Sequence, residues 1–452
     1  MTRVLVVTAD TIGPRMAGPA IRATNIAEVL GARHEVRLVT TGLVQGAGRG
    51  AESVEVERLL QLGAWAEVVV LQGWVLANHP RLADVASVVV ADVYDPMHLE
   101  QLEQGRDAGP EGHLDAVADC TTVLNQQLLR ADFLLCASER QRDFWLGQLA
   151  GLGRINPSTY GRDPSLRSLI DVAPFGLPVE PPARHLADDV ARPGAQDKVI
   201  LWGGGIYNWF DPLTLLHAVD VVRHEVPQVK LVFLGTAHPS PDIPTMQMAV
   251  QARRLADELG LTGRWVVFNE GWVPYDERQQ HLLAAHVGVS THLHHIETEF
   301  SFRTRILDYL WAGLPIVTTD GDTLAALVRD EDLGLVVPPG DVSALASALV
   351  MALSDQARRA RWAANAARVA PRYQWPTVLE PLTRFCDDPR RAPDLIDPAA
   401  RRRLDPGSAL PSRTGWRADA RRAVQLVRGD GPVALLRRSL RRARRRSSRR
   451  TT

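Results

Sequence analysis

Along the first 176 residues, short apolar runs take turns with segments whose hydrophobic positions recur every three to four residues, and this pattern predicts a series of strands and helices. Short apolar or β-branched runs separate segments whose apolar positions recur at helical spacing, such as Ala20–Leu30 and Val117–Leu129. The predicted strands are Val4–Thr8, Glu35–Thr40, Glu67–Leu71, Ser87–Ala91 and Phe133–Ala137, and the series runs to Ile170–Gly176. Strands that alternate with helices predict a parallel sheet in a doubly wound α/β domain.

A second series of the same kind follows residues 177–197, which are rich in Pro, Ala and Arg and which we interpret as a linker. Its predicted strands are Val199–Trp202, Val229–Leu234, Trp265–Phe268, Val287–Ser290, Ile316–Thr318 and Leu335–Val337. Its predicted helices are Pro212–Val226, Met246–Leu259, Asp276–Ala285, Arg303–Ala312 and Val342–Leu353. We therefore expect two doubly wound domains, each of which binds ligands at the carboxyl ends of its strands.

Length and composition agree with this organisation. A chain of 452 residues, 45% of them hydrophobic, can fill two cores. No run of 18 apolar residues is present, and Met1–Val7 is too short for a secretory signal, so we expect a cytoplasmic protein. Cys120, Cys136 and Cys386 lie far apart without a CxxC pair, which predicts buried thiols rather than disulfides or a zinc site.

The net charge of zero hides a strongly basic C-terminal segment. From Arg390 onward the chain carries 19 Arg and 5 Asp, a net charge of +14, so the preceding residues carry −14. Residues 387–412 are rich in Pro, Asp, Ala and Arg, and this composition predicts a segment that contributes little to a hydrophobic core. Residues 431–446 place a few Val and Leu among arginines, which favours a basic amphipathic helix on an anionic membrane, each Arg contributing about 1 kcal/mol. A solvated tail and a nucleic-acid patch are the alternatives, and the lack of interleaved aromatics disfavours nucleic acid.

Residues 295–315 hold the densest candidate chemistry, because acids, two arginines and a predicted helix start fall within one short stretch. Ser301 is the expected N-cap, which would leave the first backbone N–H groups of Phe302, Arg303 and Thr304 free to hold a phosphate beside Arg305. One turn further on, Asp308 could accept hydrogen bonds from a sugar hydroxyl next to that phosphate. The alternative is a surface helix with an ordinary ion pair between Arg305 and Asp308.

Glycine loops follow the first predicted strand of each half. Gly18 lies in residues 13–22, just before a helix, where a backbone could approach a phosphate or a sugar closely. This loop does not match GxGxxG, and a merely flexible loop is the alternative. Gly203, Gly204 and Gly205 follow a strand directly and are more specific, because three consecutive glycines cost conformational entropy unless something must pass close to the backbone.

The order of these motifs resembles the retaining, nucleotide-sugar-dependent glycosyltransferases of family 4. The resemblance rests on the Gly18 loop, Pro174–Gly176, the Gly203–Gly205 loop, Leu231–Gly235, Gly271–Tyr275 and the Phe302–Pro315 helix, and covers residues 1–388. It implies a GT-B fold, with two facing Rossmann-like domains, the donor on the second and the acceptor on the first. The implied divisions are 1–180 for the first domain, 181–197 for the linker, 198–372 for the second domain and 373–388 for a helix that crosses back. Composition adds residues 389–452 as an Arg-rich, partly disordered tail.

Carried over by position, the resemblance assigns Asp308 to the second acid of the E-x7-E motif of the family, which holds the donor ribose. The first acid falls on Phe300, so Glu299 or Glu297 would have to replace it. The cations that the family places after the first strand of the second domain are also missing, since Gly205 and residues 208–212 offer none. Arg303 and Arg305 are the nearest substitutes.

For the first domain, the resemblance places a polar catalytic-site residue on the loop Asp92–Glu100. Asp92, Asp95 and His98 are all candidates to contact the donor sugar. No DxD stands at the end of a strand, so a metal is not implied.

The resulting hypothesis is transfer of a hexose-type unit from a nucleoside diphosphate sugar, with retention, to a glycan or lipid-linked acceptor in cell-surface polysaccharide or glycolipid synthesis. No cofactor beyond the donor is expected, and the tail suggests attachment to the inner face of the plasma membrane. The catalytic candidates are Asp95, His98, Arg303 and Arg305, and the donor-binding candidates are Gly18, Gly204, Gly205, Glu299, Thr304 and Asp308. A GT-B epimerase or phosphorylase and a silent nucleotide-sugar-binding protein are the alternatives.

Overall fold

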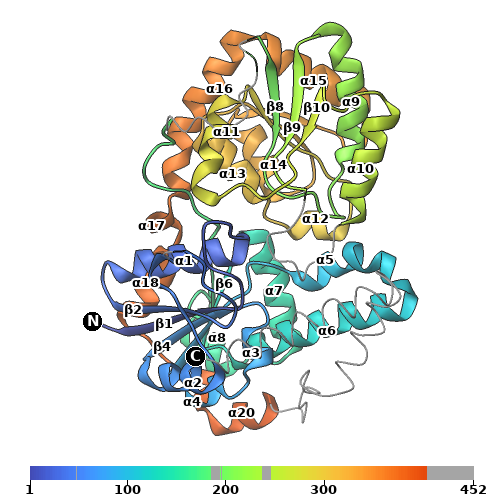
Figure 1. The fold of residues 1–452 in the computed structure, drawn as a ribbon. Helices are drawn as coiled ribbons and strands as arrows, with labels where there is room; N and C mark the ends of the chain where they lie inside the picture. Colours follow the sequence, from blue (N-terminus) through green and yellow to red (C-terminus); the bar gives the residue numbers. More distant parts are fainter. Residues whose placement is uncertain (47, 185–193, 195, 237–245, 405–452) are drawn as a thin grey trace, which may run out of the picture.

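Two separate parallel sheets, each flanked by helices, organise the chain in the computed structural model (Figure 1). The structure describes residues 1–46, 48–184, 194, 196–236 and 246–404. The first sheet has the order β3-β2-β1-β4-β5-β6-β7, from β1 (Arg3–Thr8), β2 (Glu35–Thr40), β3 (Glu52–Ser53), β4 (Val68–Gln72), β5 (Val88–Asp92), β6 (Phe133–Cys136) and β7 (Ile170–Val172). The second has the order β10-β9-β8-β11-β12-β13, from β8 (Lys198–Trp202), β9 (Val229–Phe233), β10 (Val266–Phe268), β11 (Val287–Ser290), β12 (Ile316–Thr319) and β13 (Gly334–Val337). The predicted fold class, two doubly wound α/β domains, is confirmed.

Alternate residues of each central strand enter different cores, because side chains along a strand point to opposite faces. Val4 and Val6 of β1 face one core of the first sheet, and Leu5 and Val7 face the other. The covering helices are α1 (Gly18–Gly31), α2 (Val56–Trp65), α3 (Val75–Asn78), α4 (Leu82–Val85), α5 (Met97–Gln104), α6 (Gly109–Arg130), α7 (Glu139–Gly151) and α8 (Pro157–Arg162). Both faces of the sheet are therefore dry, which explains why its strands read as nearly continuous apolar runs.

The second sheet is covered in the same way. Its helices are α9 (Pro212–Glu225), α10 (Gln247–Glu258), α11 (Arg278–Ala284), α12 (Ile296–Phe300), α13 (Thr304–Trp311), α14 (Thr323–Asp330), α15 (Val342–Ser354) and α16 (Gln356–Val369). α9, α10 and α15 pack on one face, and α13 and α14 pack on the other. The sequence pattern did not predict α12, α14 or α16. α12 is a single short turn, and α14 and α16 lie between recognised motifs.

The chain returns to the first domain after α16, through η4 (Ala370–Tyr373), α17 (Trp375–Val378) and α18 (Glu380–Asp387) (Figure 1). The backbone N–H of Leu177 donates to the carbonyl of Tyr373 at 2.7 Å, and the N–H of Trp375 donates back to Leu177 at 2.9 Å. Phe385 then stacks on Phe133 with the ring centroids 4.5 Å apart. One continuous apolar cluster thus runs from the first sheet into the second domain.

Residues 389–404 also belong to the first domain, contrary to the expectation of a poor core former. They form α19 (Pro393–Ile396) and α20 (Pro398–Leu404). Asp394 accepts from Arg154 Nε at 2.6 Å, and both side chains are fully buried. Asp132 accepts from Arg391 Nε at 2.7 Å and from the Ala392 N–H at 2.9 Å. Residues 405–452, with the predicted amphipathic helix, lie outside the described residues.

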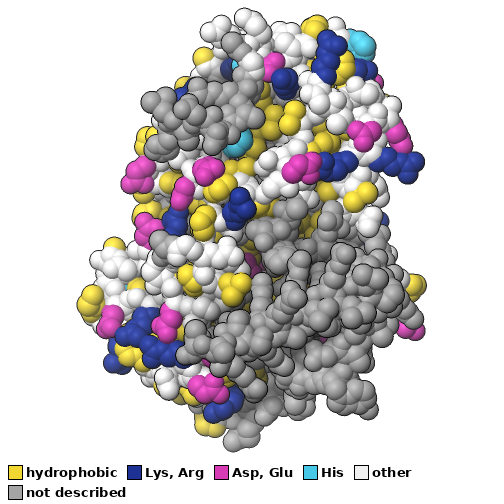
Figure 2. Space-filling model, viewed as in Figure 1, with side chains coloured by type: hydrophobic (Ala, Val, Ile, Leu, Met, Phe, Trp, Pro, Cys, Tyr) yellow, Lys and Arg dark blue, Asp and Glu magenta, His cyan; other side chains and the backbone are white. Residues whose placement is uncertain are grey.

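The three cysteines are buried and free, as the spacing predicted. None of the helices in the described ranges is long and apolar enough to cross a bilayer. On the face that Figure 2 shows, the described basic and acidic side chains lie interspersed over both domains.

Candidate functional site

The carboxyl ends of both sheets meet around a cavity of about 430 Å³ between the two domains. The first domain lines it with the loops after β1, β5 and β7, and the second with the loop after β8, the Trp272–Arg278 segment and the stretch from Glu297 to Asp308. A cavity of this size between two doubly wound sheets suits a small-molecule ligand.

The Gly203–Gly205 loop forms one wall of the cavity. The N–H of Gly203 donates to the Tyr309 hydroxyl of α13 at 2.8 Å, which fixes the loop to that helix. Gly204 has φ +79°, where a side chain is strained, and a Cβ at Gly205 would lie 3.0 Å from the Tyr207 ring. The space next to Gly204 is open. A ligand can therefore approach this backbone closely.

The helix start expected at Ser301 lies further along the chain. Residues 296–300 form α12, the Ser301 hydroxyl donates to the Thr298 carbonyl, and α13 begins at Thr304 with Arg303 as its N-cap. Ser301 was therefore the wrong N-cap, because α12 uses it as a C-cap. The N–H groups that a helix start leaves without helical acceptors belong to Thr304 and Arg305 rather than to Phe302.

Arg303 has its own carboxylate partner. Its two Nη atoms donate to the two Glu297 oxygens at 2.8 and 2.6 Å, and both residues are buried. Glu297 lines the cavity, whereas Glu299 does not; the Glu299 backbone carbonyl accepts from Arg140 of α7. Of the two acids proposed to replace the missing one, the structure brings Glu297 to the site.

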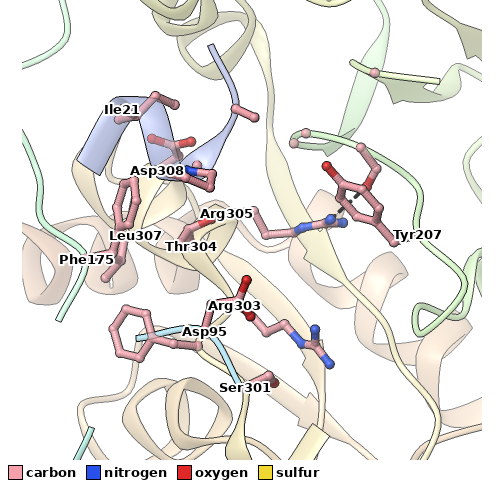
Figure 3. Close-up of a pocket in the computed structure, with 18 of the residues that line it drawn as sticks. Ile21, Asp95, Phe175, Tyr207, Ser301, Arg303, Thr304, Arg305, Leu307 and Asp308 are labelled. Carbon is pink, nitrogen blue, oxygen red and sulfur yellow. Dashed lines mark hydrogen bonds between the residues drawn. The ribbon is translucent and has the colours of Figure 1, made fainter. Parts of the chain in front are cut away.

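Arg305 is a buried cation without an acid. Its guanidinium lies over the Trp202 and Phe210 rings, 4.4 and 4.0 Å from their centroids, and its Nη2 donates to the Gly205 carbonyl at 2.9 Å. In Figure 3 the Arg305 side chain extends toward Tyr207. Only 7% of the residue is exposed, Nη1 has no hydrogen-bond partner, and no carboxylate of the described residues forms an ion pair with it. Burial lowers the pKa of Arg305 to about 10, so the group is still charged at neutral pH. A buried guanidinium that has no acidic partner and lines a cavity is suited to an anionic ligand.

Asp308 lines the cavity one turn into α13, and Ile21 of the first domain lines the same cavity (Figure 3). Its Oδ1 accepts from Arg278 Nε at 3.0 Å, and about a third of its side chain remains exposed. The ion pair between Arg305 and Asp308, which was the alternative interpretation of this helix, does not form, because the Arg305 side chain turns toward the Gly205 loop instead. Asp308 is therefore held by one partner and remains accessible to a ligand.

The first-domain wall is acidic. Asp95 and Glu100 both line the cavity. Burial and the nearby charge of Glu297 raise the pKa of Asp95 to about 7, and burial and the nearby charge of Asp95 raise the pKa of Glu100 well above its ordinary value. Burial also raises the pKa of Asp10 on the same wall. Two neighbouring carboxyl groups of this kind share a proton near neutral pH. They can donate as well as accept hydrogen bonds with hydroxyl groups.

Eight of the ten candidate residues line the cavity, and two do not. Those that the structure brings together are Gly18, Gly204, Gly205, Asp95, Arg303, Thr304, Arg305 and Asp308. His98 instead packs near the Phe144 and Trp145 rings, with centroids 5.6 and 5.8 Å away, and burial lowers its pKa to about 4. Glu299, as described above, does not line the cavity.

The third candidate of the first-domain loop, Asp92, has a structural role. It accepts from Arg22 Nε at 2.5 Å and from Arg22 Nη2 at 2.9 Å, and both residues are buried outside the cavity lining. Glu100, which the sequence did not single out, also lines the cavity. Its spacing to Gln104, which also lines the cavity, is one helical turn on α5, and this polar i, i+4 pair was the available signal. Arg278 was missed because no motif marks it.

Comparisons with known proteins show which family part of the chain matches and which fold it has. Residues 197–355, which include the Gly203–Gly205 loop and Glu297–Asp308, match the family described as Glycosyl transferases group 1. Over 84 residues the chain is 37% identical to phosphatidyl-myo-inositol mannosyltransferase of Mycobacterium leprae. This matched segment makes up 19% of this chain and 22% of that protein. The match thus spans about a fifth of the length of that curated relative.

Solved structures resemble the chain over most of its length. HepE from Anabaena, in complex with UDP-glucose, has a TM-score of 0.63 and 15% identity, covering 86% of this chain and all of that one. WaaG, a glycosyltransferase involved in lipopolysaccharide biosynthesis, has a TM-score of 0.58 and 18% identity, covering 85% of this chain and 100% of that one. The chain therefore has the two-domain GT-B fold of glycosyltransferases, and its second domain is similar to the group 1 glycosyl transferases.

Proposed function

We propose that this protein transfers a hexose-type unit from a nucleoside diphosphate sugar to a hydroxyl group of a glycan or lipid-linked acceptor, with retention at the anomeric carbon. Arg305 carries the proposal, since a buried guanidinium without an acid, beside a glycine loop and a helix start, requires an anionic ligand. The diphosphate would meet Arg305 and the N–H groups of Thr304 and Arg305. The ribose would meet Asp308.

The reaction that we propose breaks the bond between the anomeric carbon and the phosphate oxygen. A bond forms from the acceptor oxygen on the same face, and the acceptor proton moves to the leaving diphosphate. Arg305 and the start of α13 would stabilise the charge that develops on the phosphate, and one such donor typically contributes ~3 kcal/mol. Glu297, paired with Arg303, would orient the sugar between the domains.

The acceptor side favours a neutral, hydroxyl-bearing group. The cations that line the cavity, Arg278, Arg303 and Arg305, all come from the second domain, whereas the first-domain wall offers Asp10, Asp95 and Glu100. Two carboxyl groups that share one proton can form hydrogen bonds with hydroxyl groups. They repel a phosphate at the reacting end of the acceptor. A cell-surface glycan or glycolipid fits this wall, and the mannosyltransferase relative, whose name specifies a phosphatidyl-myo-inositol acceptor, supports a lipid-linked one.

A panel of UDP- and GDP-sugars, followed for nucleotide release with and without added glycan acceptors, tests the function. Release that needs an acceptor supports the transferase, and release without one favours an epimerase or phosphorylase. Binding without turnover would identify a silent binder, and no binding of any donor would overturn all three. Because Arg305 supplies the charge that a metal otherwise provides, we expect EDTA to leave turnover unchanged.

We also propose a cytoplasmic protein that attaches to the inner membrane face through its Arg-rich tail, since the chain from Arg390 onward carries a net charge of +14. Since residues 389–404 pack on the first domain, the variant that tests this must lack only residues 405–452. Vesicles with and without anionic lipid are the probe. Equal binding of the full and shortened chains to anionic vesicles would contradict the attachment.

A further inference from the structure

Arg278, at the first position of α11, has a guanidinium group that four contacts hold in place. Its guanidinium carbon lies 3.6 Å from the centroid of the Tyr275 ring and 4.9 Å from that of the Trp311 ring. Its Nη1 donates to the Tyr275 carbonyl at 2.7 Å, and its Nε donates to Asp308 Oδ1 at 3.0 Å. Two rings and two directed hydrogen bonds leave this guanidinium one orientation.

This orientation determines where the Asp308 carboxylate points. Arg278 engages only Oδ1, both residues line the cavity, and Oδ2 has no hydrogen-bond partner among the described residues. An aspartate reaches one methylene less far than a glutamate, so its free oxygen meets a ligand hydroxyl only if the carboxylate is held in place. The Arg278 side chain is only 12% exposed, which shields the pair from competing water.

The segment that carries Arg278 also contacts the loop before α1. The Tyr275 N–H donates to the Pro14 carbonyl at 2.9 Å, and Trp272 Nε1 donates to the Met16 carbonyl at 3.1 Å. Asp276 pairs with Arg49 of the first domain at 2.7 Å. Arg278 therefore connects Asp308 to a segment that is braced against the opposite domain.

We propose that Arg278 is a positioning residue for ribose recognition: it fixes Asp308 so that the free carboxylate oxygen accepts from a ribose hydroxyl of the donor. This rests on the proposed nucleotide-sugar function and adds to it the residue that makes the shorter acid sufficient. Arg278 does not touch the reacting atoms. Its loss affects the choice between nucleotides with and without ribose hydroxyls.

Calorimetry of the full chain with UDP, GDP and their 2′,3′-dideoxy analogues tests the proposal. We expect the wild type to bind one of the two ribonucleotides about tenfold or more tightly than its dideoxy form, as expected for a lost hydrogen bond to a charged group. In Arg278→Gln that ratio should fall to about threefold or less. Arg278→Lys, which keeps the aliphatic stem and the charge, should show the same fall if the first variant does not fold.

Arg253→Gln is the matched control, because Arg253 forms an exposed pair with Glu270 on the same domain at 2.8 Å and does not line the cavity. Its dideoxy ratio should match the wild type. If the wild type and the Arg278 variant discriminate equally between the ribonucleotide and its dideoxy form, the positioning role is overturned and the proposed function is not. A wild type that binds a nucleotide without discriminating also overturns it, and one that binds neither UDP nor GDP overturns the proposed function as well.

Discussion

Arg303 and Arg305 stand two positions apart and were predicted to act alike, yet burial gives them different partners. Arg303 is neutralised by Glu297, whereas Arg305 has only a backbone carbonyl. The sequence could predict that this stretch binds an anion, because the charges and the helix start are local. It could not divide the roles, since Glu297 precedes Arg303 across a turn that no periodicity predicts. For the same reason it placed His98 in the site, although aromatic rings of α7 surround it.

Replacing Arg305 by Met should have opposite effects on activity and stability. Turnover should fall about a hundredfold, or ~3 kcal/mol, because the leaving diphosphate loses its buried cation. The free energy of unfolding without nucleotide should not fall, since the substitution removes a buried charge that lacks an acid. Steady-state kinetics and urea unfolding measure the two effects.

Arg303→Ala is the contrasting variant, because it leaves Glu297 buried without its partner. Breaking such a pair costs about 3–5 kcal/mol, so this variant should unfold more easily as well as turn over more slowly. Equal destabilisation by the two substitutions would contradict the distinction between them.

The acidic wall predicts how stability depends on pH. Asp95 has a pKa raised to about 7 in the folded chain, from an ordinary value of 3.8, and Glu100 is raised in the same direction. The folded chain thus holds protons that the unfolded chain has released, so the free energy of unfolding should fall as pH rises from about 4 to about 7. Urea unfolding at pH 5 and pH 8 should show a smaller fall in an Asp95→Asn, Glu100→Gln double variant. An unchanged fall would exclude these two groups as its source.

At the scale of helices and strands, prediction from sequence succeeds where burial is periodic. The strand predictions are confirmed because strands buried on both faces form apolar runs that end at polar or glycine positions. The start of α13 was predicted from the nearest serine and was wrong, because a separate turn, α12, uses that serine. Residues 389–404 were misjudged for a related reason, since their contacts are buried polar pairs rather than an apolar stripe.

Shortening the chain should test that docked segment. A chain that ends at Leu404 should unfold with the same free energy as the full chain, whereas one that ends at Asp388 leaves Arg154 buried without Asp394. We expect the second truncation to cost about 3–5 kcal/mol, the usual effect of removing one partner of a buried ion pair. The substitution Asp394→Ala should reproduce most of this loss. If both truncated chains were equally stable, the docked segment would contribute nothing to the first domain.

At the scale of the whole molecule, the unexpected Phe300 has an explanation in the packing between the domains. Its ring lies 4.7 Å from that of Phe144 on α7, and its carbonyl accepts from Gln141 Nε2 at 2.7 Å. The position that the resemblance assigns to an acid is here a contact that holds the domains together. A single sequence cannot reveal such a contact, because the two residues are distant along the chain and belong to different domains.

Placing Glu at position 300 should therefore reduce activity rather than restore a missing group. The carboxylate would face an aromatic ring, and Glu297 already supplies the acid in the cavity. We expect slower turnover and a larger radius of gyration by small-angle scattering, with Phe300→Leu as the control that keeps the apolar contact. Turnover above the wild type in Phe300→Glu would contradict this explanation.

The buried pair between Arg154 and Asp394 also has a consequence for synthesis of the chain. Its two members lie 240 residues apart, so the first domain leaves the ribosome long before the partner of Arg154 has been translated. During that interval the domain would contain an uncompensated cation in its interior. Its nascent form should therefore remain loosely folded until the second domain has also emerged, which makes the order of translation a determinant of when the first domain becomes native.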